Sequence, residues 1–359
     1  MKKKLTIAFF GSSLVSAYWN GAATYYRGII QALYQRGHRT TFFEPNAFGR
    51  QQHRDIADPS WAKVVVYPAT LDGMCEAIES ARAADVIIKA SGVGVLDAEL
   101  EAAVLELKRD SNRVVFWDVD APATLDRLIN DTRDPLRSLI PQYDLVLTYG
   151  GGNPVVEGYK FLGAIACMPI YNAVDPTTHF PVRARQDFIS DLSFVGNRLP
   201  DREARVDEFF FRAAKLLPEL RFLLGGSGWE KKRLTRNIKY IGHVYTADHN
   251  WLNCSARSIL NVNRESMARY GFSPATRVFE AAGAGACMIT DYWEGLEQFL
   301  EPGTEVLVAR DGEEVSSILS ILDVERSQRI GAAACKRVLA EHTYAKRAAQ
   351  VEEVLQAVA

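Results

Sequence analysis

The sequence predicts an α/β protein built from two doubly wound parallel sheets. Short apolar runs alternate with amphipathic helical segments along the chain, and polar or glycine-rich stretches follow the apolar runs. This alternation is typical of parallel sheets whose ligand-binding loops lie at the carboxyl ends of the strands. A length of 359 residues favours about two domains, and the alternation starts afresh near residue 190.

The composition argues against several classes of protein. The net charge is −2, with 24% charged and 48% apolar residues. The apolar residues suffice for two hydrophobic cores, and basic residues are not in excess. A surface that attracts nucleic acid is therefore not expected. The five cysteines are scattered, which indicates neither a disulfide framework nor a zinc site and favours reduced thiols in the cytoplasm. No apolar run is long enough for a transmembrane helix.

In the first half, apolar runs predict strands at residues 5–10, 40–44, 63–67, 85–89, 113–117 and 143–148. Helical periodicity predicts helices at 20–33, 74–84, 97–109 and 125–139, the first of them capped at Asn20. The loop after the first strand contains Ser12, Ser13, Asn20 and Gly21. Two interpretations of it stay open: a loop that faces a ligand, or a turn in which Gly21 only permits the backbone path.

Two acidic residues, Asp118 and Asp120, follow the fifth predicted strand. Because side chains alternate along extended backbone, only one of the two is expected to point toward a ligand. For Asp118 the simpler role, capping the helix near Pro122, is the preferred interpretation. Asp120 is the candidate functional acid.

In the second half, strands are predicted at 191–195, 220–224, 238–241, 258–263, 287–290 and 303–308. Helices are predicted at 201–217, from 249 onward, at 273–283, at 311–322 and at 345–358. Glycine-containing loops at 196–198, 225–228 and 242–244 follow three of these strands. A glycine cluster by itself is weak support for a phosphate site.

Residues 270–291 carry the strongest functional pattern. Ser273 followed by Pro274 predicts a capped helix start. Arg277 and Glu280 lie three residues apart, so they share one helix face. The helix amides, the positive end of the helix dipole and Arg277 would bind an anion, and Glu280 would accept hydrogen bonds from sugar hydroxyls, as a nucleotide diphosphate requires. The alternative is a solvated surface pair of little energetic consequence.

The segment 277–283, followed by Thr290-Asp291 and by residues 295–297, resembles the donor-binding element of GT-B glycosyltransferases. It is most similar to the CgeB-like (spore-maturation protein) family. Residues 172–181 resemble the linker between the two domains of that fold, with Ala173 in place of the usual glycine. The resemblance covers nearly the whole chain.

The resemblance implies the GT-B fold. It has two Rossmann-like domains, residues 1–172 and 173–340, that face a cleft, and a C-terminal helix at 341–359 that crosses back to the first domain. It also implies a metal-independent glycosyltransferase that takes a sugar from a UDP-, GDP- or dTDP-linked donor. The acceptor, a glycan, a protein or a small molecule, is not identified, and no cofactor besides the nucleotide sugar is expected. A sugar-nucleotide epimerase and a non-catalytic nucleotide-sugar-binding protein stay open as alternatives.

The resemblance further assigns site residues. The donor is expected to contact Gly196, Asn197, Arg198, Gly226, His243, Val244, Ser273, Arg277 and Glu280. Ser12, Ser13, Asn20 and Gly21 are expected on the acceptor side of the cleft, and Asp120 is the expected base if the reaction inverts the anomeric centre. Arg198 as a solvated turn residue and His243 as a structural histidine are the simpler alternatives. Phe272, eight positions before Glu280, stands where retaining enzymes usually carry a glutamate.

Overall fold

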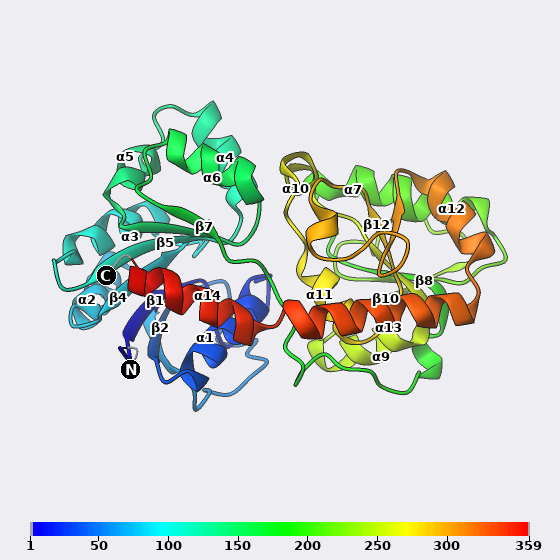
Figure 1. Ribbon diagram of the computed structural model, residues 1–359, viewed down its shortest axis with the longest axis horizontal. Coiled ribbons are helices and arrows are strands. Elements are labelled where there is room, and N and C mark those ends of the chain that lie inside the picture. Colours follow the sequence, from blue (N-terminus) through cyan, green and yellow to red (C-terminus); the bar gives the residue numbers. More distant parts are fainter. Residues whose placement is uncertain (1–2, 358–359) are drawn as a thin grey trace. The chain divides into compact units, whose positions relative to one another are not determined.

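The computed structural model describes residues 3–357, which form two compact units. The first unit contains the chain up to Tyr171 and again from Tyr344, and the second contains Asn172–Thr343. Each unit consists of a parallel sheet covered by helices (Figure 1). The predicted pair of doubly wound parallel sheets is therefore confirmed.

The first sheet has seven parallel strands in the order β3-β2-β1-β4-β5-β6-β7. The strands are β1 (Thr6–Phe10), β2 (Arg39–Asn46), β3 (Lys63–Pro68), β4 (Val86–Ala90), β5 (Arg113–Asp118), β6 (Leu145–Thr148) and β7 (Cys167–Pro169). Strand β7 was not predicted, because three residues are too few to show a period. The helices are α1 (Ala23–Gln35), α2 (Leu71–Ala81), α3 (Asp97–Ala103), α4 (Ala121–Asn130), α5 (Leu136–Leu139), α6 (Gly152–Phe161) and α14 (Tyr344–Ala357), with 3-10 turns at Val104–Leu107 and Ile140–Gln142.

The last helix, α14, packs against α1 within the first unit. Gly28 of α1 makes room for it, since a Cβ atom there would lie 2.2 Å from the Tyr344 ring. Further along α14, Glu352 forms an ion pair with Arg36 and lies 3.2 Å from Nε2 of the buried His38. The expected contact between the C-terminal helix and the first domain is confirmed.

The second sheet has six parallel strands in the order β10-β9-β8-β11-β12-β13. The strands are β8 (Ser190–Val195), β9 (Phe222–Gly225), β10 (Ile238–Gly242), β11 (Ala256–Asn261), β12 (Met288–Asp291) and β13 (Leu307–Ala309). The helices are α7 (Pro200–Val206), α8 (Arg212–Leu216), α9 (His249–Ser255), α10 (Glu265–Tyr270), α11 (Thr276–Gly283), α12 (Gly312–Ile321) and α13 (Val324–Glu341), with 3-10 turns at Gln186–Phe188, Thr246–Asp248 and Leu296–Gln298. A π-helical segment, Asp207–Phe211, interrupts the single helix predicted at 201–217, and α10 and α13 were not predicted.

Apolar side chains fill both sheets' faces. In the first unit Phe9 stacks on Phe42 with ring centroids 5.2 Å apart. In the second unit, Phe194, Phe210 and Ile289 belong to one buried cluster. Within residues 3–357, no helix has both the length and the apolar character that crossing a membrane requires.

Candidate functional site

Polar side chains gather in the second unit at the carboxyl ends of β8 and β11. These neighbouring strands are the point where the strand order reverses, because β9 and β10 lie on one side and β12 and β13 on the other. Ligands of doubly wound sheets bind at such a switch point, outside the carboxyl ends of the strands. The loops that follow β8 and β11, together with the start of α11, are therefore the expected location of a ligand-binding site.

Helix α11 begins at Thr276, so the predicted start at Pro274 with a Ser273 cap is wrong. Ala275 still has an extended backbone, with ψ of 153°, and the helix can start only after it. Ser273 is buried, and within the described residues its hydroxyl has no hydrogen-bond partner. A donor-binding role for Ser273 stays a prediction.

Arg277 of α11 bridges the ends of the two strands at the switch point. Its guanidinium donates to the Val195 carbonyl at the end of β8 and, at 3.4 Å, to the Asn261 side chain at the end of β11. The same group lies 5.3 Å from the centroid of the Phe194 ring. Arg277 is therefore held at the carboxyl edge of the sheet, on the first turn of α11.

The positive charge of Arg277 has no carboxylate at ion-pair distance within residues 3–357. Burial lowers the pKa of Arg277 to about 10, although the nearby Glu280 and Asp291 oppose the shift. The Asp291 carboxylate pairs with Arg205 instead, at 2.6 Å. A partly buried cation bonded only to neutral oxygens costs the free protein stability, and an anionic ligand would compensate it.

A second guanidinium, that of Arg202 on α7, lies 5.7 Å from the same Phe194 ring. It donates to the Asn197 carbonyl at 2.5 Å, and its Nε atom is buried with no hydrogen-bond partner in the described part of the chain. Burial and then the charge of Arg277 lower the pKa of Arg202 to about 10. Arg202 was not predicted as a site residue, because a lone arginine on a helix gives no sign that it is close to Arg277.

The loop after β8 packs tightly against the loop after β9. The Asn197 side chain accepts the Ser227 amide at 3.0 Å, and the Gly196 carbonyl accepts the Trp229 indole N–H at 2.7 Å. Gly226 has a φ of +110°, and a Cβ atom there would lie 2.3 Å from the Gly196 carbonyl oxygen. Glycine is thus required at 226 for the two loops to approach each other.

Arg198, His243 and Val244 are the remaining predicted donor contacts. Arg198 is ion-paired with Glu203 at 2.7 Å, so its charge is compensated in a way that the charge of Arg277 is not. The His243 side chain is exposed and meets the Tyr245 ring edge-on at 4.7 Å, whereas Val244 is buried. The contacts of these residues with a donor stay predictions.

Glu280 lies one helical turn beyond Arg277 on α11. Its side chain is only 13% exposed, and one carboxylate oxygen lies 3.8 Å from Nε2 of the buried His179. His249 completes a group in which the three ligand-type atoms all lie within 4.8 Å of one another. Neither histidine was singled out from the sequence, because both are far from Glu280 along the chain.

In the first unit, side chains of the loop after β1 bond to one another. Ser12 Oγ donates to Asn20 Oδ1 at 2.8 Å, Asn20 Nδ2 donates to the Ser13 carbonyl at 2.8 Å, and Ser13 Oγ donates to Glu44 at 3.0 Å. Asn20 therefore does not cap α1, which begins at Ala23 instead of at the predicted residue 20. The loop is ordered by these bonds whether or not it also meets an acceptor.

Gly21 is exposed at the end of this loop. Its φ is not positive, and a Cβ atom there would have no neighbour within 4 Å. The backbone path therefore does not require glycine at this position. An acceptor-side role for Gly21 stays a prediction.

Asp118 and Asp120 lie in different surroundings. Asp118 is fully buried at the end of β5, where its carboxylate accepts hydrogen bonds from the hydroxyls of Ser91, Thr124 and Tyr159. It orders the core around the start of α4. Asp120 is the half-buried N-cap residue of α4, and its side chain makes no capping hydrogen bond. Its role as a base stays a prediction.

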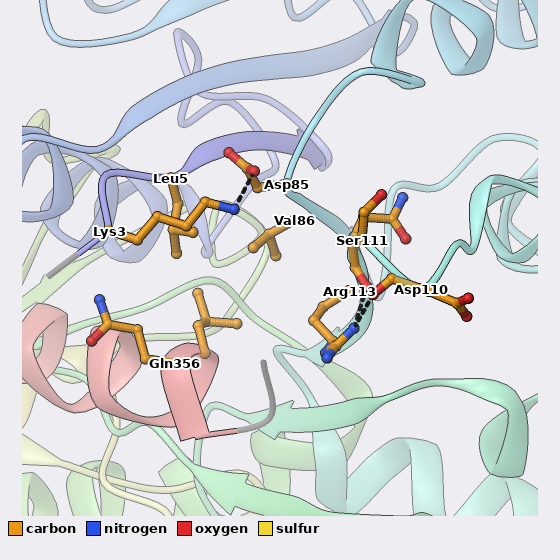
Figure 2. Close-up of a pocket in the computed structure, with 10 residues that line it drawn as sticks. Lys3, Leu5, Asp85, Val86, Asp110, Ser111, Arg113 and Gln356 are labelled. Atoms are coloured by element: carbon orange, nitrogen blue, oxygen red, sulfur yellow. Dashed lines mark hydrogen bonds and ion pairs between the residues drawn. The ribbon is translucent and has the colours of Figure 1, made fainter.

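A pocket in the first unit lies at the other edge of the sheet (Figure 2). Its lining comes from the amino-terminal sides of β1, β4 and β5 and from α14: Lys3, Leu5, Asp85, Val86, Asp110, Ser111, Asn112, Arg113, Leu355 and Gln356. Lys3 and Asp85 form an ion pair at 2.8 Å across it. Because ligands of doubly wound sheets bind at the carboxyl ends of strands, this pocket is not part of the candidate site.

Residues 202–353 match a protein-family model described as glycosyl transferase-like. The match covers most of the second unit, including Arg202, Arg277 and Glu280. The protein carries a glycosyltransferase domain and has the GT-B fold. The predicted resemblance to the CgeB-like glycosyl transferases, and with it the glycosyltransferase class, is confirmed.

Solved GT-B structures align with this glycosyltransferase over almost its whole length. HepE from Anabaena, solved with UDP and glucose, has a TM-score of 0.70 and 14% identity, covering 98% of this chain and 100% of that chain. Sucrose-phosphate synthase from Thermosynechococcus elongatus has a TM-score of 0.72 and 14% identity, covering 99% of each chain. BGT of phage T4, solved with UDP-glucose, has a TM-score of 0.62 and 12% identity, covering 99% of each chain. No curated protein matches the chain.

Proposed function

We propose that the protein transfers a sugar from a UDP-linked donor to an acceptor, and that Arg277, Arg202 and Glu280 hold the donor. The observation that carries the proposal is the pair of guanidinium groups that share the Phe194 ring, neither of them ion-paired to a carboxylate of residues 3–357. Together with the amino end of α11 they suit a diphosphate. UDP is the nucleotide to test first, because HepE and phage T4 BGT were both solved with UDP-glucose.

In this proposal the protein's own cations take the place of a divalent metal at the diphosphate. Charge develops on the leaving diphosphate as the glycosidic bond breaks, and fixed donors aimed at that charge lower the barrier. Glu280, about 4.5 Å further along α11, accepts hydrogen bonds from the ribose hydroxyls. The donor is thereby held at both ends of its nucleotide diphosphate.

The stereochemical outcome that we propose is inversion, with Asp120 as the base. Phe272 replaces the glutamate usual in retaining enzymes, and it adopts a φ of +46°. A Cβ atom at Gly295 would lie 2.1 Å from the Phe272 ring, so the ring is closely packed at this position. No carboxylate is therefore available at 272, and an acidic residue of the first unit remains the candidate.

Calorimetric titration with UDP and with inorganic pyrophosphate tests the proposal. Glu280→Gln removes the charge but keeps the shape, so UDP affinity should fall about tenfold while pyrophosphate, which has no ribose, binds as before. Glu313→Gln, an exposed residue paired with Arg212, is the matched control. The wild type should bind UDP equally well in EDTA. No UDP binding by the wild type, or equal losses for both ligands in Glu280→Gln, would contradict the assignment.

Product analysis with isotopically labelled UDP-glucose separates transfer from the alternatives. Release of free UDP, with the label on an acceptor or on water, supports a transferase. An altered sugar still attached to UDP would identify an epimerase. Tight UDP-glucose binding without turnover across an acceptor library would identify a binding protein and overturn the proposed reaction.

A further inference from the structure

The three side chains His179, His249 and Glu280 come from separate segments of the second unit. His179 lies in the loop before β8, His249 is the first residue of α9, and Glu280 is on α11. Asn250 joins the loop to α9, because its side chain donates to the Thr178 carbonyl at 2.8 Å and accepts the Phe180 amide at 3.3 Å. The two imidazole groups are therefore held beside each other by hydrogen bonds of their flanking residues.

The tautomer of His179 follows from its neighbours. Thr178 Oγ1 lies 3.2 Å from the Asp175 carbonyl, to which it donates its single proton, and 3.0 Å from His179 Nδ1. Since the hydroxyl proton is used on Asp175, the hydroxyl oxygen accepts from Nδ1–H. The lone pair of His179 is then on Nε2, which is buried and has no hydrogen-bond partner within the described residues.

His249 presents a second lone pair to the same space. One of its ring nitrogens hydrogen-bonds to the Val244 carbonyl, and in the neutral ring that nitrogen carries the proton. The other ring nitrogen is then an acceptor. Two imidazole lone pairs and one carboxylate face one another in a partly buried space, and they repel one another unless a cation lies between them.

The distances fit a small divalent ion. In a tetrahedral zinc site with bonds of about 2.0–2.2 Å, the ligand atoms lie roughly 3.3–3.5 Å apart. His179 Nε2 and the Glu280 carboxylate are already 3.8 Å apart, and all three ligand atoms lie within 4.8 Å of one another. Small side-chain rotations would bring the three ligand atoms to the separations of a zinc site. The second nitrogen of each imidazole is bonded to a protein oxygen, as is usual for metal-bound histidines.

We propose that His179, His249 and Glu280 form a binding site for a divalent transition-metal ion, with zinc the best match to two imidazoles and one carboxylate. Three protein ligands leave a fourth position open for water or another ligand. Donor binding as proposed above needs no metal, but the two sites share Glu280. If Glu280 also binds the ribose, the metal withdraws one of its carboxylate oxygens, so zinc and UDP should weaken each other's binding; this second point rests on the proposed function.

The metal site is tested first without nucleotide. Protein stripped with EDTA and dialysed is titrated with zinc chloride by calorimetry, and we expect one zinc ion per chain, bound more tightly than about 10 μM. His179→Gln and His249→Gln should each weaken binding by more than about tenfold, and Thr178→Val, which removes the partner of Nδ1, by about tenfold. His243→Gln, an exposed histidine of the same unit, is the matched control for zinc affinity. Thermal unfolding of each variant confirms that it is folded.

The outcomes test the metal site and its coupling to UDP binding separately. Zinc binding weaker than this in the wild type would overturn the site, and equal affinity in both histidine variants would show that zinc binds elsewhere, for example at thiols. A UDP titration of the zinc-loaded protein then tests the coupling: unchanged UDP affinity would overturn it while leaving the metal site intact. Failure of the metal-free protein to bind UDP contradicts the proposed function alone, because the zinc titration uses no nucleotide.

Discussion

Replacement of Arg277 is the sharpest test of the donor site. The guanidinium is partly buried, lies on the first turn of α11 and bonds only to the Val195 carbonyl and the Asn261 amide oxygen among the described residues. A guanidinium has five N–H donors, so several are left for a phosphate. Arg277→Ala removes all of them at once, together with the charge.

The expected loss of UDP affinity follows from these contacts. A hydrogen bond to a charged group contributes about 1.5–3 kcal/mol, which corresponds to a loss of about 10- to 150-fold in UDP affinity. Arg277→Lys should recover only part of this, because an ammonium group lacks the planar fork. Stability should change little by comparison: two hydrogen bonds are lost, but the cost of a partly buried charge without an ion pair disappears as well.

The assay is calorimetric titration of UDP, with thermal unfolding measured in parallel. Arg202→Ala should also weaken UDP binding, since Arg202 shares the Phe194 ring with Arg277. Arg212→Ala, which removes an exposed arginine paired with Glu208 and Glu313, is the control. UDP affinity like that of the wild type in both Arg277→Ala and Arg202→Ala would refute the reasoning. The donor-binding role of Arg277 is also refuted if Arg277→Ala unfolds the protein while Arg277→Lys binds UDP normally.

Two further predictions concern the first unit. Burial lowers the pKa of His38, although Glu352 opposes the shift, so the folded state resists a proton that the unfolded chain accepts near pH 6.5. The free energy of unfolding of the wild type should therefore fall as the pH falls from 7 toward 5, by at most about 1.4 kcal/mol per pH unit from this group. In urea unfolding, His38→Gln should show a shallower decline. Parallel plots of unfolding free energy against pH for the two proteins would contradict this. Asp120→Asn should lower sugar transfer at least about 100-fold without changing UDP affinity, and transfer near the wild-type rate would exclude Asp120 as the base.

The geometry that explains the His38 prediction is simple. Its Nδ1 atom accepts the Leu5 amide at 3.1 Å, so Nε2 carries the only ring proton and faces Glu352 at 3.2 Å. A second proton on Nδ1 would point at the Leu5 N–H. The Leu5 N–H therefore opposes protonation of His38, whereas Glu352 on α14 favours it.

Much of the architecture follows from local patterns that the sequence displays directly. Apolar runs followed by amphipathic segments predicted both sheets, because a parallel strand and its crossover helix are adjacent along the chain. Arg277 and Glu280 could be placed on one helix face for the same reason, since their spacing of three residues is a local quantity. The cap at Ser273 failed because the positive φ values of Gly271 and Phe272 introduce a turn that no residue-type rule anticipates.

Contacts between distant segments could not be predicted in this way. Arg202 approaches Arg277 only because β8 pairs with β11, and that pairing was not deducible from either helix alone. His179 and His249 meet Glu280 through a loop and two helices, with no motif spacing to reveal them. The predicted helix cap at Asn20 was wrong, because its side chain hydrogen-bonds to Ser12 and Ser13 instead. An asparagine near a helix start suits both roles, so the sequence does not distinguish them.

The charge pattern at the switch point links the fold to its ligand. The charge of Arg277 lowers the affinity of Arg202 for its proton, which is an unfavourable arrangement in a protein with nothing to bind there. Glu280 and Asp291 lie near Arg277 and partly offset its charge. Asp291, however, pairs with Arg205 and accepts the Asn263 amide, which fixes the end of β12 to the loop after β11. The scaffold thus uses Asp291 for structure and, within residues 3–357, leaves Arg202 and Arg277 without an ion-paired carboxylate. In the proposed function, part of the binding energy of a diphosphate would then come from relief of this repulsion.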